Sequence, residues 1–179
     1  MPAPELKTKR LLLRQWKKSD LIPFSKMNND PKVMEFFPST LIKLESDKLA
    51  KKIQKELQEE KFGLWAVEVI DVAPFIGFIG LHNVSFTAHF TPAIEMAWKL
   101  GFKYWNKGYA LEGAQAVVDY AFNTLGLDQI VSFTPTKNLR SIKLMKKLNM
   151  AHDPKDNFNH PKLTRNNSLS LHVLYRLKN

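Results

Sequence analysis

The segment that decides the fold reads Trp105-Asn106-Lys107-Gly108-Tyr109-Ala110, and it lies between an apolar run and a stretch with helical spacing. A Lys-Gly turn that opens a helix can direct backbone N–H groups outward, because glycine lets the main chain approach a ligand with no Cβ in the way. The helix that follows adds unpaired donors and the positive end of its dipole, which favour an anion. Lys-Gly also marks ordinary tight turns, so the surrounding sequence has to decide the interpretation.

The sequence on both sides of this turn predicts interleaved strands and helices. The expected strands cover residues 10–14, 64–70, 75–81, 93–100, 129–133 and 169–177. The expected helices cover residues 19–27, 45–61 (with Ser46 as N-cap), 109–124 and 138–147. Hairpin-length connections come early, and a strand–helix–strand crossover comes late. We therefore expect a single α/β (α+β) domain over residues 1–179, with a mixed, mostly antiparallel central sheet of about six to seven strands and helices on both faces.

Composition narrows the classes of protein and partner. The chain has 179 residues, a net charge of +10 and no cysteine, which excludes disulfides, thiol nucleophiles and thiolate metal sites. No window approaches the roughly 18 apolar residues of a membrane span, and the first residues do not resemble a signal peptide, so we expect a cytoplasmic protein with no membrane contact. The positive charge favours a nucleotide cofactor, an acidic substrate or RNA, or else serves solubility alone.

Across nearly the whole chain, the order of these segments resembles the GNAT N-acetyltransferase superfamily. The closest resemblance is to the branch that contains the ribosomal-protein N-terminal (alanine/serine) acetyltransferases. Three segments carry it: residues 95–110, which are similar to that branch's strand, loop and pyrophosphate turn, residues 138–150, and the ending at 172–177. The resemblance implies a GNAT-like fold and an acetyl-CoA-dependent N-acetyltransferase. Its acceptor would be a primary amine, either a protein N-terminal α-amino group or a small amine, attacking the thioester directly.

The resemblance also implies where acetyl-CoA binds. Its pyrophosphate would lie on the N–H groups of residues 106–110, and its pantetheine would follow the strand edge near Leu100 and Phe102 like an added strand. Asn138 would bond the pantetheine amides. The implied cofactor-binding residues are Leu100, Phe102, Trp105, Asn106, Lys107, Gly108, Tyr109, Ala110, Asn138 and Ser141.

Glu95 and Ser141 are the candidate catalytic residues. Glu95 is an acidic residue within the apolar run at 93–98, and burial would raise its pKa toward a value that suits a base acting through a water. The alternative is a carboxylate that faces solvent or an arginine and holds the sheet edge. Ser141 would contact the sulfur, and whether it protonates the thiolate stays open. Many superfamily members have a tyrosine for this task at the position of Met145, which cannot donate a proton.

The acceptor would be bound by Phe36, Phe37, Glu95 and His160. In the branch resembled, the segment around Phe36 and Phe37 borders the acceptor site, and His160 belongs to a long segment, 151–167, that could fold over the cleft. No pair of histidines has metal-ligand spacing, so we expect no metal.

Two other functions remain open from the sequence. The first is a non-catalytic acyl-CoA-binding sensor or partner module, which the methionine at position 145 would allow. The second is a basic RNA- or ribosome-binding domain. Because no nucleic-acid-binding motif is present, we expect contact with nucleic acid only indirectly, through the ribosome. Exposed sheet edges would also permit a homodimer.

Overall fold

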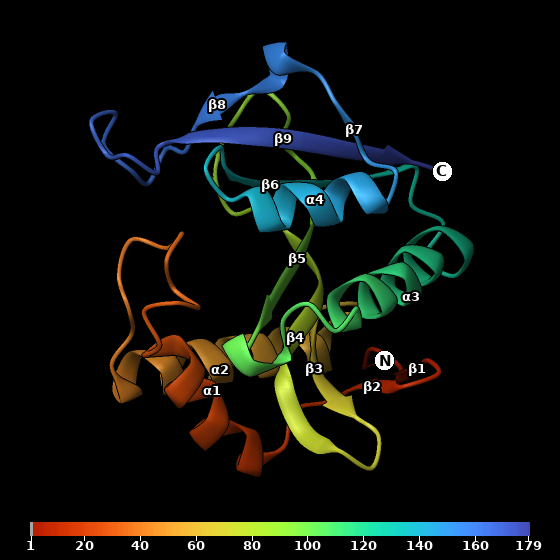
Figure 1. The fold of residues 1–179 in the computed structure, drawn as a ribbon. Coiled ribbons are helices and arrows are strands. Elements are labelled where there is room, and N and C mark those ends of the chain that lie inside the picture. The colour runs from red at the N-terminus through yellow and green to blue at the C-terminus, as the bar shows by residue number, and fades with distance from the viewer. Residues whose placement is uncertain (1) are drawn as a thin grey trace.

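A computed structural model describes residues 2–179 as one twisted sheet with helices on both faces (Figure 1). The strands are β1 (Leu6–Lys7), β2 (Leu11–Arg14), β3 (Leu64–Val69), β4 (Ala73–Asn83), β5 (Ile94–Leu100), β6 (Gln129–Pro135), β7 (Ala151–His152), β8 (Phe158–Asn159) and β9 (Leu171–Lys178). The helices are α1 (Leu21–Asn28), α2 (Lys43–Glu59), α3 (Tyr109–Asn123) and α4 (Leu139–Lys147), with short 3-10 turns η1 (Lys18–Asp20), η2 (Phe102–Tyr104) and η3 (Pro154–Asp156). None of these helices is long and apolar enough to cross a membrane.

The predicted fold class is confirmed. The strand order is β1-β2-β3-β4-β5-β6-β9-β7, with β8 paired to β9, and the pairs are antiparallel except for β5 and β6. Each predicted strand is present, and the three additional ones, β1, β7 and β8, have two residues each. A strand of two residues is too short to show alternation in the sequence, so only its pairing with a neighbouring strand identifies it.

The predicted N-cap of α2 is wrong. The helix begins at Lys43, and the carboxylate of Glu45 accepts a hydrogen bond from the Ile42 N–H at 3.0 Å. Ser46 lies one turn inside the helix and is buried, and its hydroxyl accepts a hydrogen bond from the buried Asn28 side chain at 2.8 Å. A buried amide must find a partner, so the tertiary contact with α1 explains the serine.

The junction between β5 and β6 divides the sheet. These parallel strands are paired at one register position, Glu95 with Val131, while β4 follows β5 over its full length. Figure 1 shows β1 to β5 with α1 and α2 on one side of this junction, and β6 to β9 with α4 on the other. The sheet therefore opens between residues 96–100 and the end of β6.

Close packing brings α3 onto the sheet. Gly113 lies inside this helix, where glycine costs up to about 1 kcal/mol relative to alanine. A Cβ at Gly113 would lie 2.6 Å from Cδ1 of Ile79 in β4 and 3.4 Å from Cδ1 of Leu11 in β2. Glycine thus lets the helix approach β2 and β4, and this packing places the N-terminus of α3 beside the open part of the sheet.

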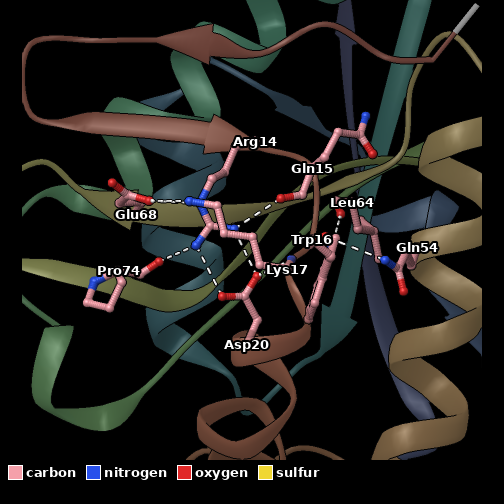
Figure 2. Close-up of polar contacts among 9 residues, drawn as sticks. All are labelled: Arg14, Gln15, Trp16, Lys17, Asp20, Gln54, Leu64, Glu68 and Pro74. Carbon is pink, nitrogen blue, oxygen red and sulfur yellow. Dashed lines mark hydrogen bonds and ion pairs between the residues drawn. The ribbon is translucent and has the colours of Figure 1, made fainter.

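A buried charge cluster joins η1 to β2, β3 and β4 (Figure 2). Arg14 is 1% exposed and donates to both oxygens of Asp20, at 2.8 and 3.1 Å, and to Glu68 at 2.8 Å. It also donates to the backbone carbonyl of Pro74. The Asp20 carboxylate in turn accepts the Lys17 N–H at 2.7 Å, so both buried charges are compensated.

Substitution of Arg14 tests how far this cluster stabilises the fold. We expect Arg14→Met to lower the free energy of unfolding by about 3–5 kcal/mol, because Asp20 would stay buried without its counter-charge. Lys17→Met is the matched control, since Lys17 Nζ is 3.7 Å from Glu68 and its side chain is 60% exposed. The control should change the unfolding free energy by less than about 1 kcal/mol. Urea denaturation followed by circular dichroism measures both, and equal effects would contradict the assignment.

Candidate functional site

The turn before α3 presents unpaired backbone donors. Asn106 and Gly108 have φ values of +58° and +80°, a left-handed geometry that turns the chain sharply into the helix. Within residues 2–179, no acceptor is found for the N–H groups of residues 106–111. The acidic residue of the first helical turn, Glu112, is held by Arg10 at 2.6 Å and by Thr8 at 2.7 Å. These free amides at a helix N-terminus fit a pyrophosphate.

The open edge of β5 presents further backbone groups. The Gly101 N–H donates to the Ile76 carbonyl at 2.9 Å, and backbone groups alternate in direction along an antiparallel pair. Trp98 and Leu100 therefore direct their backbone groups away from β4, toward the gap in the sheet. Trp105 Nε1 donates to the Leu100 carbonyl at 2.8 Å, which leaves the Leu100 N–H. An extended chain with amide groups, such as pantetheine, fits this edge.

Asn138 and Ser141 form a small hydrogen-bonded unit at the start of α4. Asn138 Nδ2 donates to Thr134 Oγ1 at 2.9 Å and to Ser141 Oγ at 3.0 Å, and its Oδ1 accepts from the Ser141 N–H at 3.2 Å. Trp98 Nε1 also donates to Ser141 Oγ, at 3.4 Å. Both amide hydrogens of Asn138 are thus used inside the protein. The Ser141 hydroxyl accepts two bonds, and its own hydrogen has no acceptor among the described residues.

Glu95 faces His82 across the hairpin of β4 and β5. The two residues are register partners, and His82 Nε2 lies 3.1 Å from a Glu95 carboxylate oxygen. The side chain of Glu95 is 12% exposed, and that of His82 is 32% exposed. His82 Nδ1 lies 3.2 Å from the Asn83 carbonyl, which can only accept, so Nδ1 carries a proton. Nε2 then shares one proton with Glu95.

The two groups shift each other's pKa. Burial raises the pKa of Glu95 above its ordinary value, and the hydrogen bond and charge of His82 reduce that rise. Burial disfavours the charged form of His82, but the hydrogen bond and charge of Glu95 outweigh it, so the pKa of His82 is raised. A carboxylate with a raised pKa and a route to solvent through an imidazole suits proton acceptance.

These features line one cleft of about 870 Å³. The predicted site residues on its wall are Phe36, Phe37, Glu95, Leu100, Trp105, Asn106, Gly108, Tyr109, Ala110, Asn138, Ser141 and His160. Phe102 and Lys107 do not line it. Phe102 is 45% exposed and packs on Trp105 with ring centroids 5.1 Å apart, and Lys107 is exposed and accepts a bond from Arg10 through its backbone carbonyl.

Arg140 and His160 close two sides of the cleft. Arg140 forms an ion pair with Glu35 at 2.6 Å and lies 4.4 Å from the ring centre of Trp105, so it connects α4 to the segment after α1. His160 packs on Phe86 with ring centroids 4.8 Å apart. Burial, with the charges of His172 and Lys162, lowers the pKa of His160 to about 4, which makes it neutral near pH 7.

His82 and Lys99 are among the polar residues of the cleft that the predicted site did not include. The expected strand ended at residue 81, but β4 runs to Asn83 and brings His82 opposite Glu95. Lys99 lies on the same face of β5 as Glu95, since side chains alternate along a strand. That alternation was the available signal for Lys99. Within residues 2–179, no cluster of three or more histidine or acidic residues could hold a metal ion.

Comparison with known proteins places this geometry in a family. A family model described as "Acetyltransferase (GNAT) domain" matches residues 10–151. An uncharacterised N-acetyltransferase of Bacillus subtilis, YnaD, is 32% identical over 146 residues, which cover 82% of each chain.

Two solved structures share the fold but carry different names. A putative ribosomal-protein-serine acetyltransferase from Vibrio cholerae superposes with a TM-score of 0.79 at 13% identity, covering 100% of this chain and 99% of its own. Spermidine N-acetyltransferase from the same organism, in complex with CoA and spermine, gives a TM-score of 0.74 at 17% identity and covers 96% of each chain. The ribosomal-protein acetyltransferases, which the sequence was expected to resemble most closely, are thus only one of several groups with a similar structure.

The coupling of His82 and Glu95 can be measured directly. We expect Glu95→Gln to lower the pKa of His82, because the raising hydrogen bond and charge are lost while burial remains. Titration of the histidine ring signals by NMR measures this change. His160 is the internal control, and its pKa of about 4 should stay the same in the variant. An unchanged His82 pKa would show that the two side chains do not share a proton.

Proposed function

Because the chain belongs to the GNAT acetyltransferase family and its cleft fits acetyl-CoA, we propose that it is an N-acetyltransferase whose acceptor is a primary amine. The buried Glu95, hydrogen-bonded to His82 inside that cleft, is the observation that carries the proposal. Acetyl-CoA supplies an acetyl group activated as a thioester. The other parts of the reaction fall to side chains and backbone groups of this chain.

The binding groups lie on three elements. The free amides of residues 106–111 hold the pyrophosphate, and the open edge of β5 aligns the pantetheine amides. The Leu100 N–H is positioned to donate to the thioester carbonyl oxygen, which gains negative charge as the amine attacks. Trp98 and Asn138 hold the Ser141 hydroxyl beside the same edge, where the sulfur would lie.

Glu95 and His82 handle the proton of the amine. An ammonium has no lone pair, so the acceptor must lose a proton before its nitrogen can bond to the carbonyl carbon. Glu95 accepts this proton, and His82 relays it to solvent because its ring is partly exposed. As the new C–N bond forms, the C–S bond breaks. The nitrogen then loses its second proton, which passes through the Ser141 hydroxyl or a water to the thiolate, so that the products are an amide and the free thiol of CoA.

A non-catalytic acyl-CoA-binding module is the less favoured alternative. A module that only binds acyl-CoA needs no buried carboxylate paired with an imidazole across a hairpin, and a buried charge costs free energy unless it is used or compensated. The proteins of similar structure act on unlike amines by name, a ribosomal protein and spermidine. Both types of amine therefore belong in the acceptor screen.

The first test measures acetyl transfer with and without the base. We expect Glu95→Gln to lower kcat roughly 100-fold or more, the usual effect of losing a general base, while the Kd for acetyl-CoA stays the same. Thiol release from acetyl-CoA, with peptide and polyamine acceptors, measures the rate. A chain without cysteines gives no background with thiol reagents. Calorimetric titration measures binding.

Glu59→Gln is the matched control for this test. Glu59 lies at the end of α2, is 64% exposed, and does not line the cleft. The control should keep the full rate. Acetyl-CoA binding without transfer to any amine would support the binding module instead, and a fully active Glu95→Gln variant would remove Glu95 from the mechanism.

The second test asks whether His82 positions and tunes Glu95. His82 lowers the pKa of Glu95, so His82→Gln should raise it and move the acid limb of the kcat profile to higher pH. His89→Gln is the control, because His89 pairs with Asp156 at 3.2 Å outside the cleft and should leave the profile unchanged. The same amine is used throughout, so its own ionisation cancels. An unshifted acid limb in His82→Gln would contradict the relay.

A further inference from the structure

Lys99 is a buried cation without an acidic partner. The residue is 6% exposed, and its ammonium donates to the neutral Asn28 Oδ1 at 2.7 Å. Met34 Sδ, a weak acceptor, lies 3.8 Å away. No ion pair with Lys99 exists among residues 2–179. An ammonium has three donors, so one donor and the charge itself remain without a full partner.

Aromatic rings surround this ammonium in place of a carboxylate. Nζ lies 4.7 Å from the ring centre of Phe37, 5.5 Å from that of Phe78 and 5.6 Å from that of Phe24. Such rings attract a cation but compensate only part of the cost of removing it from water. Burial accordingly lowers the pKa of Lys99 to about 8, and the group is still mostly charged near pH 7. The site would therefore gain from an anion.

The ammonium lies at the wall of the acceptor side of the cleft. Lys99, Phe37 and Phe78 line the cleft, whereas the other contacts, Asn28, Phe24 and Met34, lie behind it. Trp98, the neighbour of Lys99 in β5, points the opposite way and contacts Ser141 of α4. Lys99 thus faces the side of the sheet that α1 covers, away from the sulfur position.

The acceptor side is polarised along β5. Glu95 and Lys99 share one face of the strand, with Ala97 between them, so their Cα atoms are separated by about 13 Å, four strand residues. Glu56 of α2 lies at the Glu95 end, where its charge acts on His82. Val33, Leu49 and Ile53 contribute apolar surface to the same cleft. The cleft therefore carries an acidic group toward one end of β5 and a cationic group toward the other, beside Leu100.

We propose that Lys99 binds a carboxylate of the acceptor, so that the substrate is a small ω-amino carboxylate whose amine lies at the thioester carbonyl beside Leu100 and loses its proton toward Glu95 through water. This inference rests on the proposed N-acetyltransferase function, because it assigns the far end of the same acceptor. One ammonium with a single free donor matches a carboxylate, whereas a phosphate dianion usually takes several donors or a helix N-terminus. The enclosure of Lys99 by Phe37 favours a terminal group of a small molecule over a side chain of a peptide.

A chain-length series tests the proposal in the wild-type protein. The acceptors are ω-amino carboxylates with increasing numbers of methylenes, each compared with the n-alkylamine that lacks only the carboxylate. We expect one chain length to be preferred, with a kcat/KM at least about 10-fold above its matched alkylamine, the effect of one charge-assisted hydrogen bond. No advantage of the carboxylate at any length would overturn the inference, and turnover of alkylamines would show that the N-acetyltransferase function still holds.

Two variants locate the effect. Lys99→Met should bring the carboxylate and the alkylamine to about equal kcat/KM. Lys52→Met is the matched control, since Lys52 also lines the cleft but is 66% exposed and pairs with Glu56 at 3.7 Å, so the preference should persist. Persistence of the preference in folded Lys99→Met, or its loss in Lys52→Met, would overturn the assignment. Thermal melting and the acetyl-CoA Kd report the folding of each variant.

A binding measurement separates this inference from the proposed reaction. Calorimetry with the wild-type protein saturated with CoA, which has no acetyl group to transfer, compares the preferred amino carboxylate with its alkylamine. Tighter binding of the carboxylate, lost in Lys99→Met, supports the anion site even if no amine is acetylated. Equal binding of both ligands overturns it. Transfer to peptide N-termini, with none to the small amines, would also overturn the assigned substrate class.

Discussion

The functional geometry depends on one constraint, the single pairing position between β5 and β6. Glu95 and Val131 hold the two parts of the sheet together there, and beyond that point each strand continues without the other. An unpaired strand edge must find other hydrogen-bond partners, and here it faces a cleft. The cleft lies at this divergence, and residues of α2, α3 and α4 all contribute to its wall.

Buried charged side chains are fully compensated in one part of this molecule and only partly compensated in another. Arg14 has two carboxylates and two carbonyls around it, and this full compensation joins β2, β3 and β4 to η1 as a rigid support (Figure 2). The polar groups of the cleft are compensated less completely. Glu95 has one imidazole and Lys99 has one amide, and both have shifted pKa values because burial is not fully offset. Such residual imbalance is the usual mark of groups that act on a ligand.

Local pattern predicted the regular elements and failed where a distant partner decides. The strands and helices follow from apolar periodicity, and the Lys-Gly turn marked the start of α3 correctly. Ser46 was read as a cap from its place in the chain, but Asn28 of α1 determines its role. Phe102 and Lys107 do not line the cleft, and the roles predicted for that segment, which involve its backbone, stay predictions. His82 was missed because the apolar segment that predicted this strand ends at residue 81, whereas β4 continues to Asn83.

The sequence by itself determined the class of fold, the family resemblance and the position of the glycine turn before α3, because each of these rests on short stretches of neighbouring residues. Glycine at the turn, alternating apolar residues and the acidic Glu95 within a strand are local signals that need no partner to be recognised. Only the tertiary structure decided that Glu95 contacts His82 and that Lys99 is buried without an acidic partner. It also decided that Asn138 donates its amide hydrogens to Thr134 and Ser141. Those facts depend on strand register and on which elements pack together, and register is set by the folded sheet as a whole.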